Sequence, residues 1–361
     1  MKQLSLENLL KGYSQMHSKK IPDKLRYNRT LSIAQKFILE QNINRLPVDP
    51  FKLTARIDLP IVSASEYAMA MNCSFQHVIR DIIKSNDGTA KCVDNMQFII
   101  YNERVASKGR IRWTLLHEIG HVRLGHLIDF EETRVQRAGL TKTEYEVLEK
   151  EADCFASRVL APPIVLEALK VDNATRLITL CGLSRLAAEN RYKDFSAKLN
   201  KRRFPDLLEI KIERNFHDFI HKKYCVICGH SFVIENAKYC PICGKKRVYW
   251  GDGKMIYSGY ELDDKSKAKV CPRCENEETS LDGEHCIICG SHLVNRCTND
   301  DNENNHSYEP CGILLPGNAR YCYKCGSQST FLSNKILRRW SESQADEQVA
   351  STHDNFGDIP F

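Results

Sequence analysis

Apolar side chains recur through residues 113–129, WTLLHEIGHVRLGHLID, in the pattern of a helix buried in a protein core. These positions are Trp113, Leu115, Leu116, Ile119, Val122 and Leu124. Upstream, the β-type run Phe98–Tyr101 predicts an edge strand that leads through a glycine-containing loop into this helix. A second helix is predicted from EYEVLEKEADCFASRVL, ending before Pro162, with Leu148, Phe155, Val159 and Leu160 in the core.

Polar residues on the first helix have the chemistry of a metal site. His117 and His121 lie one turn apart on one face, so both imidazoles can reach one ion. Glu118 lies beside them, and its carboxylate can take a proton from a water that attacks a carbonyl. This H-E-x-x-H pattern predicts zinc-dependent hydrolysis, with Glu118 as the base and the edge strand available to pair with an extended peptide. The alternative is a solvated histidine pair, which the apolar flanks disfavour.

The second helix offers the third ligand that a catalytic zinc needs. We expect Glu149 to be this ligand and Asp153, one turn later, to accept a hydrogen bond from one of the histidines. Glu151 is the rival ligand, but it points away from Glu149 and is expected to be solvated. The alternative for the whole segment is an ordinary amphipathic helix.

A longer zinc pattern, with a third histidine six residues after His121, does not fit this sequence. Gly125 and His126 are each displaced by one position from that pattern. His126 is therefore expected to lie off the metal face, either supporting a ligand or facing solvent. The arrangement with a carboxylate as third ligand is preferred.

The segments RWTLLHEIGHVRLGH and EKEADCFASRVLAP together resemble the ImmA/IrrE family of metallo-endopeptidases, over roughly residues 25–200. The resemblance implies a gluzincin-like zinc peptidase that makes a limited cut in a transcriptional repressor, often in response to DNA damage or on a mobile element. It carries over His117, His121 and Glu149 as ligands, with the base and the supporting aspartate as above. Leu116 departs from the small residue that many members have there, which puts the width of the site in question. Tyr145 is a weak candidate for the oxyanion-stabilising group, which no pattern assigns.

Length and composition place these helices in a larger, multidomain chain. The 361 residues carry a formal net charge of +6, with no N-terminal apolar leader and no apolar run long enough to span a membrane. A cytoplasmic protein without membrane contact is expected. In that reducing compartment the 16 cysteines indicate metal sites rather than disulfides. Cys73, Cys92, Cys154 and Cys181 are scattered and are expected to be buried thiols.

The remaining cysteines form C-x-x-C pairs with zinc-ribbon spacing. The first ribbon is predicted at 224–247 and the second, with the same internal spacing, at 269–293; a looser third ribbon is predicted at 294–330, with His306 as a less favoured substitute ligand. Each site is expected to hold a structural Zn²⁺, because four thiolates leave no open position. The predicted ligands are Cys225, Cys228, Cys240 and Cys243; Cys271, Cys274, Cys286 and Cys289; and Cys297, Cys311, Cys322 and Cys325.

Basic and aromatic residues surround the first ribbon, as contact with nucleic acid would require, although a solvated lysine-rich face fits them equally well. They are Lys222, Lys223, Lys245, Lys246 and Arg247 with Tyr224, Tyr239, Tyr249 and Trp250. The more acidic second and third ribbons fit protein docking better. Before the ribbons, ATRLITLCGLSRLAAENRY predicts two short helices about a glycine turn, expected to pack on the peptidase domain.

The chain end predicts a docking motif on a disordered segment. After residue 331 the composition turns polar, and the sequence finishes in Asp358, Ile359, Pro360 and Phe361. This ending is similar to the acidic tip of bacterial single-stranded-DNA-binding proteins, whose last phenylalanine and carboxylate dock on DNA repair and replication enzymes. The alternative is a disordered tail that happens to end this way.

The sequence thus predicts an α+β protein: a mainly helical, zincin-like peptidase domain with a small β-sheet, three small zinc ribbons and a disordered tail. Residues 1–200 form the peptidase domain, 201–223 a basic connector and 331–361 the tail. The expected cofactors are one catalytic and three structural Zn²⁺, and the expected partners are a repressor-like protein substrate, a DNA repair or replication protein at the tail and nucleic acid at the first ribbon. The rival hypotheses are a non-catalytic adaptor and a DNA-binding regulator acting through the ribbons.

Overall fold

The computed structural model describes residues 21–94, 96–128, 141–199, 204–299 and 311–342, and it divides the chain into two compact units, Met1–Ile220 and His221–Phe361. The first unit combines helices with one small sheet, and the second holds short strands and three clusters of four cysteines, which confirms the predicted fold class. The predicted boundaries at residues 200 and 223 stay predictions. The predicted tail and its last four residues lie outside the described residues.

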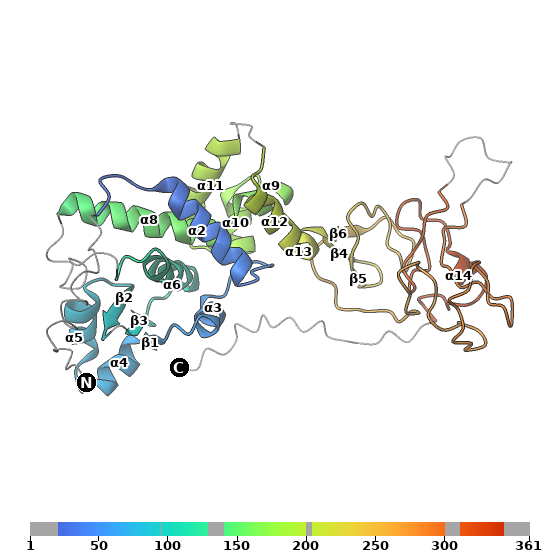
Figure 1. The fold of residues 1–361 in the computed structure, drawn as a ribbon, viewed down its shortest axis with the longest axis horizontal. Helices are drawn as coiled ribbons and strands as arrows, with labels where there is room; N and C mark the ends of the chain where they lie inside the picture. The colour runs from blue at the N-terminus through green and yellow to red at the C-terminus, as the bar shows by residue number, and fades with distance from the viewer. Residues whose placement is uncertain (1–20, 95, 129–140, 200–203, 300–310, 343–361) are drawn as a thin grey trace, which may run out of the picture. The chain divides into compact units, whose positions relative to one another are not determined.

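The first unit is built in layers (Figure 1). The small sheet lies against α6, and both α6 and α2 pack on α8. The helices are α2 (Tyr27–Glu40), α3 (Pro50–Arg56), α4 (Ala64–Ala70), α5 (Phe75–His77), the π-helical η1 (Val78–Ile83), α6 (Lys108–Arg123), α8 (Lys142–Leu160), α9 (Pro163–Ala168), α10 (Ala174–Cys181), α11 (Arg185–Leu199), α12 (Leu207–Asn215) and α13 (His217–His221).

The sheet of the first unit has the strand order β1-β3-β2, formed by β1 (Ile61–Ser63), β2 (Gly88–Val93) and β3 (Met96–Tyr101). The prediction of a strand at 98–101 is confirmed, but the prediction that it is an edge strand is wrong, because β3 pairs with β1 on one side and with β2 on the other. The hairpin partner β2, which the sequence analysis did not identify, takes one edge of the sheet, and β1 takes the other.

The two predicted helices around the candidate site are confirmed. α6 begins after Ser107, whose hydroxyl accepts from the Arg110 N–H, and α8 begins at a capping box between Thr141 and Glu144. Their apolar faces meet in the core, where Leu115, Leu116, Ile119, Phe155 and Val159 are fully buried. Leu116 therefore belongs to the core packing.

Close approach of α6 to α8 depends on a small residue. A Cβ at Gly120 would lie 3.1 Å from the Phe155 ring and 3.3 Å from the Ala152 carbonyl oxygen. This contact brings the polar face of α6, with its histidines, against the acidic face of α8. The predicted helix pair after them is α10 and α11, joined at Gly182 (φ +61°), and its apolar residues join the same core, as expected.

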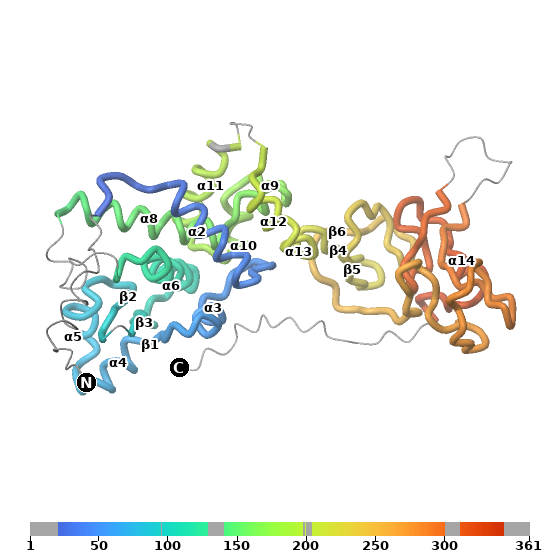
Figure 2. Tube along the Cα trace, in the orientation of Figure 1, coloured from blue at the N-terminus to red at the C-terminus, as the bar shows by residue number. Residues whose placement is uncertain are grey.

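The second unit has little regular structure, as the tube in Figure 2 shows for its yellow to orange-red segments. Its one named sheet has the order β5-β4-β6, from β4 (Lys222–Cys225), β5 (Ser231–Val233) and β6 (Val248–Trp250), and a short helix, α14 (Thr330–Ser333), lies near its end. With so small an apolar core, the fold of this unit depends on its cysteine clusters.

Candidate metal centres

The structure brings His117 and His121 from α6 together with Glu149 from α8. The two Nε2 atoms are 3.0 Å apart, and the Glu149 carboxylate oxygens lie 3.2 Å from Nε2 of His117 and 3.4 Å from Nε2 of His121. Two ligands about 2.05 Å from a tetrahedral zinc ion are about 3.3 Å apart, so this spacing fits one ion. The donor set of two imidazoles and a carboxylate suits zinc as well.

Electrostatics at this cluster favour a cation. Burial disfavours a charge on His117, but its hydrogen bonds to Asp153 and Glu149 outweigh burial and raise its pKa to about 10. Burial also disfavours the charge on Glu149, and here the contacts with His117 and His121 outweigh it and hold the pKa well below its usual range. The cluster therefore keeps its carboxylate ionised and favours a positive charge beside it, and a bound metal ion would take the place of the His117 proton.

Asp153 sets the orientation of the first histidine. Its Oδ1 lies 2.9 Å from Nδ1 of His117, so an Nδ1–H donates to the carboxylate and Nε2 is left to face His121 and Glu149. Asp153 lies one turn after Glu149 on α8, so the same helix supplies both carboxylates.

The second histidine is oriented by a network that the sequence analysis missed. Nδ1 of His121 lies 3.0 Å from Nδ1 of His126, and Nε2 of His126 lies 3.0 Å from Glu151. The Glu151 carboxylate also accepts from Arg26 through Nε (2.8 Å), Nη2 (2.8 Å) and the backbone N–H (2.9 Å).

The expectation that Glu151 is solvated is wrong: its side chain is 0% exposed. His126 is buried as well, which excludes the solvent-facing alternative. No local sequence pattern indicates this burial, because Arg26 lies 125 positions from Glu151 and comes from the segment just before α2.

Protonation states follow from these contacts. Burial works against the charge of Glu151, but the bonds from Arg26 and His126 outweigh it and hold its pKa well below the usual range, so the carboxylate only accepts. Burial lowers the pKa of His126 to about 4, so its ring is neutral near pH 7. Nε2–H of His126 then donates to Glu151, and its Nδ1 accepts from Nδ1–H of His121. Nε2 of His121 is left as a lone pair that faces the cluster.

Glu118 lies between the cluster and the sheet. It is buried, and its Oε2 accepts from the backbone N–H of Ala90 at 2.6 Å. Ala90 belongs to the edge strand β2, so the outer edge of the sheet faces the candidate site. Tyr145 lies on α8 one turn before Glu149 and is half-buried, and its role stays a prediction.

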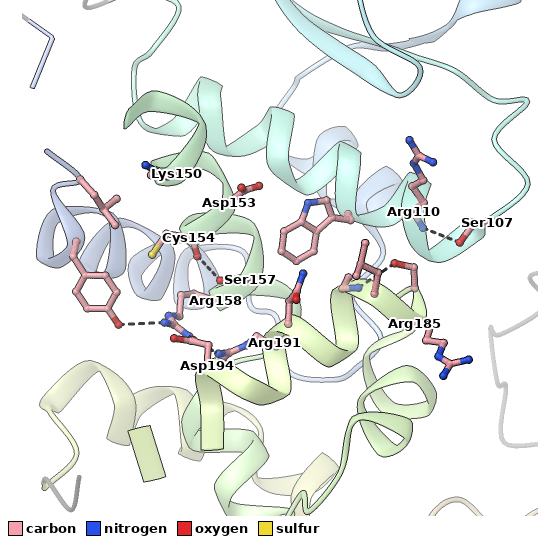
Figure 3. A pocket seen from close by; sticks show the side chains of 17 residues that line it. Ser107, Arg110, Lys150, Asp153, Cys154, Ser157, Arg158, Arg185, Arg191 and Asp194 are labelled. Atoms are coloured by element: carbon pink, nitrogen blue, oxygen red, sulfur yellow. Dashed lines mark hydrogen bonds and ion pairs between the residues drawn. The ribbon is translucent and has the colours of Figure 1, made fainter. Parts of the chain in front are cut away.

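A cavity of about 1130 Å³ opens beside the cluster, with Asp153 in its wall (Figure 3). Trp113, one turn before His117 on α6, forms part of the lining, together with the first turns of α11 around Leu186 and Ala187. Also in the wall, Asp194 pairs with both Arg158 (2.9 Å) and Arg191 (2.8 Å). The accessible surface of the cavity is mostly apolar, and charged side chains also form part of its wall.

Three clusters of four thiols lie in the second unit, each made of the cysteines predicted for one ribbon. The Sγ···Sγ distances recorded within the clusters run from 3.4 to 3.7 Å. Ligands about 2.3 Å from a tetrahedral zinc ion are about 3.8 Å apart, so each cluster fits one ion. His306, the less favoured substitute, lies outside the described residues.

Among the described residues, no helix has the length and apolar character needed to cross a membrane. No curated protein matches the chain. The model of the IrrE N-terminal-like domain, Peptidase_M78, matches residues 76–193, a range that contains α6, α8 and the His117, His121 and Glu149 cluster. Over these residues the chain is therefore similar to metallopeptidase domains of the ImmA/IrrE type.

Proposed function

We propose that the protein is a zinc-dependent endopeptidase that makes a limited cut in a regulatory protein. The observation that carries this proposal is the convergence of His117, His121 and Glu149 beside Glu118, at the edge of a sheet. Such a set supplies three zinc ligands and a general base, whereas a purely non-catalytic adaptor has no need of the Glu118 base.

In this site His117, His121 and Glu149 would hold a zinc ion. Zinc, when bound, acts as a Lewis acid toward the scissile carbonyl and makes water a stronger nucleophile near neutral pH. Asp153 holds His117 by its Nδ1–H, and Glu151 holds His121 through His126, so both imidazoles present Nε2. Glu118 takes the proton from the attacking water and returns it to the leaving amine.

The substrate is bound as an extended strand along β2. Ile99 donates its backbone N–H to Pro60, on the β1 side, so its partner Ala90 directs its own N–H away from β3 and toward Glu118. A peptide that adds to this edge passes directly over the Glu118 carboxylate. The cavity behind Trp113 takes a large apolar side chain of that peptide, because its lining is mostly apolar.

We propose a helix-turn-helix repressor as the substrate class, with a link to DNA damage or to a mobile element. The test is coexpression of the intact chain with such repressors, followed by mass spectrometry of the repressors. Wild-type protein and a Glu146→Gln control, changed at an exposed site on α8, should make the same specific cut. Glu118→Gln should make none while keeping its zinc. A cut that survives Glu118→Gln contradicts the proposed mechanism.

The first ribbon has a face that favours a second function, contact with nucleic acid. Lys245, Lys246, Arg247, Tyr249 and Trp250 are all exposed and follow one another through β6. Cations bind the phosphate backbone and exposed aromatic rings stack with bases. The test is fluorescence anisotropy with single-stranded DNA at several salt concentrations. Lys245→Glu with Lys246→Glu should weaken binding and reduce its salt dependence, and a protein without salt-dependent affinity contradicts this function.

The tail is proposed to recruit a DNA repair or replication protein, and thus to bring the peptidase to damaged or stalled DNA. Its residues Asp358 to Phe361 lie outside the described residues, so only the sequence supports this part. Deleting residues 359–361 should abolish co-purification of such proteins, and unchanged recovery contradicts the idea. Because zinc thiolates persist in a reducing compartment, we propose the cytoplasm as the location.

A further inference from the structure

The first and third ribbons pair with each other through equivalent residues. We call the second C-x-x-C-G segment of each ribbon its knuckle: residues 240–244, 286–290 and 322–326. The carbonyl of Pro241, in the first knuckle, accepts from the backbone N–H groups of Arg320 (2.8 Å) and Tyr321 (2.9 Å). The carbonyl of Tyr323, in the third knuckle, accepts in the same way from residues 238 (2.8 Å) and 239 (3.0 Å).

This pairing has approximate twofold symmetry, because each ribbon contributes one carbonyl acceptor and two N–H donors from equivalent positions. In both ribbons the acceptor follows the first knuckle cysteine, and the donors are the two residues before that cysteine. The glycine after the second knuckle cysteine also occupies an equivalent position in both ribbons, against a tyrosine ring of the other ribbon. A Cβ at Gly244 would lie 2.7 Å from the Tyr321 ring, and a Cβ at Gly326 would lie 2.8 Å from the Tyr239 ring.

Pairing buries the first knuckle, where Ile242 is 0% exposed. The second knuckle has the same parts without this cover. Its acceptor is the carbonyl of Ile287, its donors are the N–H groups of Glu284 and His285, and Gly290 has the same left-handed backbone (φ +70°) as the other two glycines.

The pairing groups of the second knuckle face open space. No hydrogen bond is recorded for the N–H of Glu284, the N–H of His285 or the carbonyl of Ile287 within the described residues. A Cβ at Gly290 would meet nothing within 4 Å. Ile287 and Ile288 are 59% and 69% exposed.

The ladder inside the second ribbon shows why His285 is available. Leu293 donates to the Glu284 carbonyl and Cys286 donates to the Ser291 carbonyl, so the N–H of His285 points outward from that ladder. The third ribbon has the same ladder, in which residue 329 donates to residue 320 and residue 322 to residue 327. There the outward N–H of residue 321 makes the pairing bond.

We propose that the second knuckle pairs with the second knuckle of another copy of this chain, in the arrangement that joins the first and third ribbons. The surface is self-complementary under a twofold axis. The two N–H donors of one copy would meet the carbonyl acceptor of the other copy, and the His285 ring of one copy would meet the open glycine of the other. The first and third knuckles are already paired with each other, so the second is the one left for another copy.

Charge does not oppose this contact. Glu284 is the one carboxylate among residues 284–290, and it forms an ion pair with Arg296 through two guanidinium nitrogens. The pair reduces the repulsion between the two copies of Glu284 across the axis. A contact limited to two knuckles is small, so the dimer should dissociate in the micromolar range.

The test is analytical ultracentrifugation of the intact zinc-loaded chain over a range of concentrations, for wild type, Ile287→Asp and the control Ile227→Asp. Ile227 is also an exposed apolar residue between two zinc-ligand cysteines, but it lies in the first C-x-x-C pair of the first ribbon. We expect a reversible wild-type dimer, an unchanged dimer for Ile227→Asp and a dissociation constant at least about tenfold higher for Ile287→Asp, with equal zinc contents.

A photo-crosslinking amino acid at position 288 gives an independent readout in a mixture of ¹⁴N- and ¹⁵N-labelled chains. Crosslinks between differently labelled copies within residues 284–290 support the proposal. A monomer at every concentration, a dimer that both variants weaken equally, or crosslinks only to another protein or another segment would each overturn it.

Discussion

Replacing Glu151 by glutamine tests whether a residue that does not contact the metal controls a ligand through His126. Both carboxylate oxygens of Glu151 accept: Oε1 from Arg26 Nε and N–H, and Oε2 from Arg26 Nη2 and from His126. The glutamine side chain has one acceptor oxygen and one NH₂ group. Its NH₂ group must therefore face an N–H group of Arg26 or of His126, and that hydrogen bond is lost. If the NH₂ group faces His126, that ring changes tautomer and donates from Nδ1, and His121 then carries its proton on Nε2.

These contacts indicate how far Glu151→Gln should lower zinc affinity and the free energy of unfolding. Loss of a partner behind a metal-bound histidine lowers metal affinity about 10- to 100-fold, and the additional ring between Glu151 and His121 places this case near the lower end. Tenfold corresponds to about 1.4 kcal/mol. The free energy of unfolding should also fall by about 1.5 to 3 kcal/mol, the usual range for a buried hydrogen bond to a charged group.

The assay equilibrates the intact protein in buffers of decreasing free zinc and measures the zinc that remains bound per chain. Each zinc site that empties produces a step in this curve. The step of the histidine site is the one that Glu149→Ala changes, because this variant lacks a proposed ligand of that site. Glu151→Gln should shift that step to about tenfold higher free zinc, whereas Glu146→Gln, at an exposed position of the same helix, should not shift it. An unshifted step for Glu151→Gln refutes the relay through His126.

His126, Gly109 and Cys286 each allow a further test. His126 should stay neutral, with constant imidazole NMR shifts from about pH 8 to about pH 5.5, because burial lowers its pKa from 6.5 to about 4. A titration midpoint of these shifts near pH 6.5 would contradict its burial. Gly109→Ala should reduce the free energy of unfolding by about 1 to 3 kcal/mol, because a Cβ there would lie 2.6 Å from the Ser184 backbone nitrogen. Urea titration measures this change, and an unchanged unfolding midpoint would show that the turn before α11 moves to accommodate the methyl group without cost. Cys286→Ser should lower the zinc content from about four to about three atoms per chain, and an unchanged content would contradict the second cluster.

Local spacing in the sequence was enough to predict the pieces of the site but not all of their supports. A separation of four residues on a helix fixes which side chains share a face, so His117 with His121, and Glu149 with Asp153, could be grouped in advance. The same holds for the C-x-x-C pairs, whose ligands are close in sequence.

Contacts over long sequence distances could not be predicted in this way. Glu151 was misjudged because its partner Arg26 comes from a distant segment, which converts an apparently outward carboxylate into a fully buried one. The order of the sheet was missed for a similar reason, since α4, α5, η1 and β2 separate β1 from its partner β3 along the chain. The pairing of the first and third ribbons likewise depends on backbone groups, which leave no pattern in side-chain identity.

The central claim is that Glu118 performs proton transfer in a zinc peptidase site. The most direct measurement is a proteome-wide comparison of new protein N-termini in cells that express wild-type protein or Glu118→Gln at equal levels, with and without DNA damage. The account predicts a small set of new N-termini, in one or a few regulatory proteins, that appears with the wild type and is absent with the variant, while both proteins bind the same amount of zinc. The same new N-termini in both samples would contradict it.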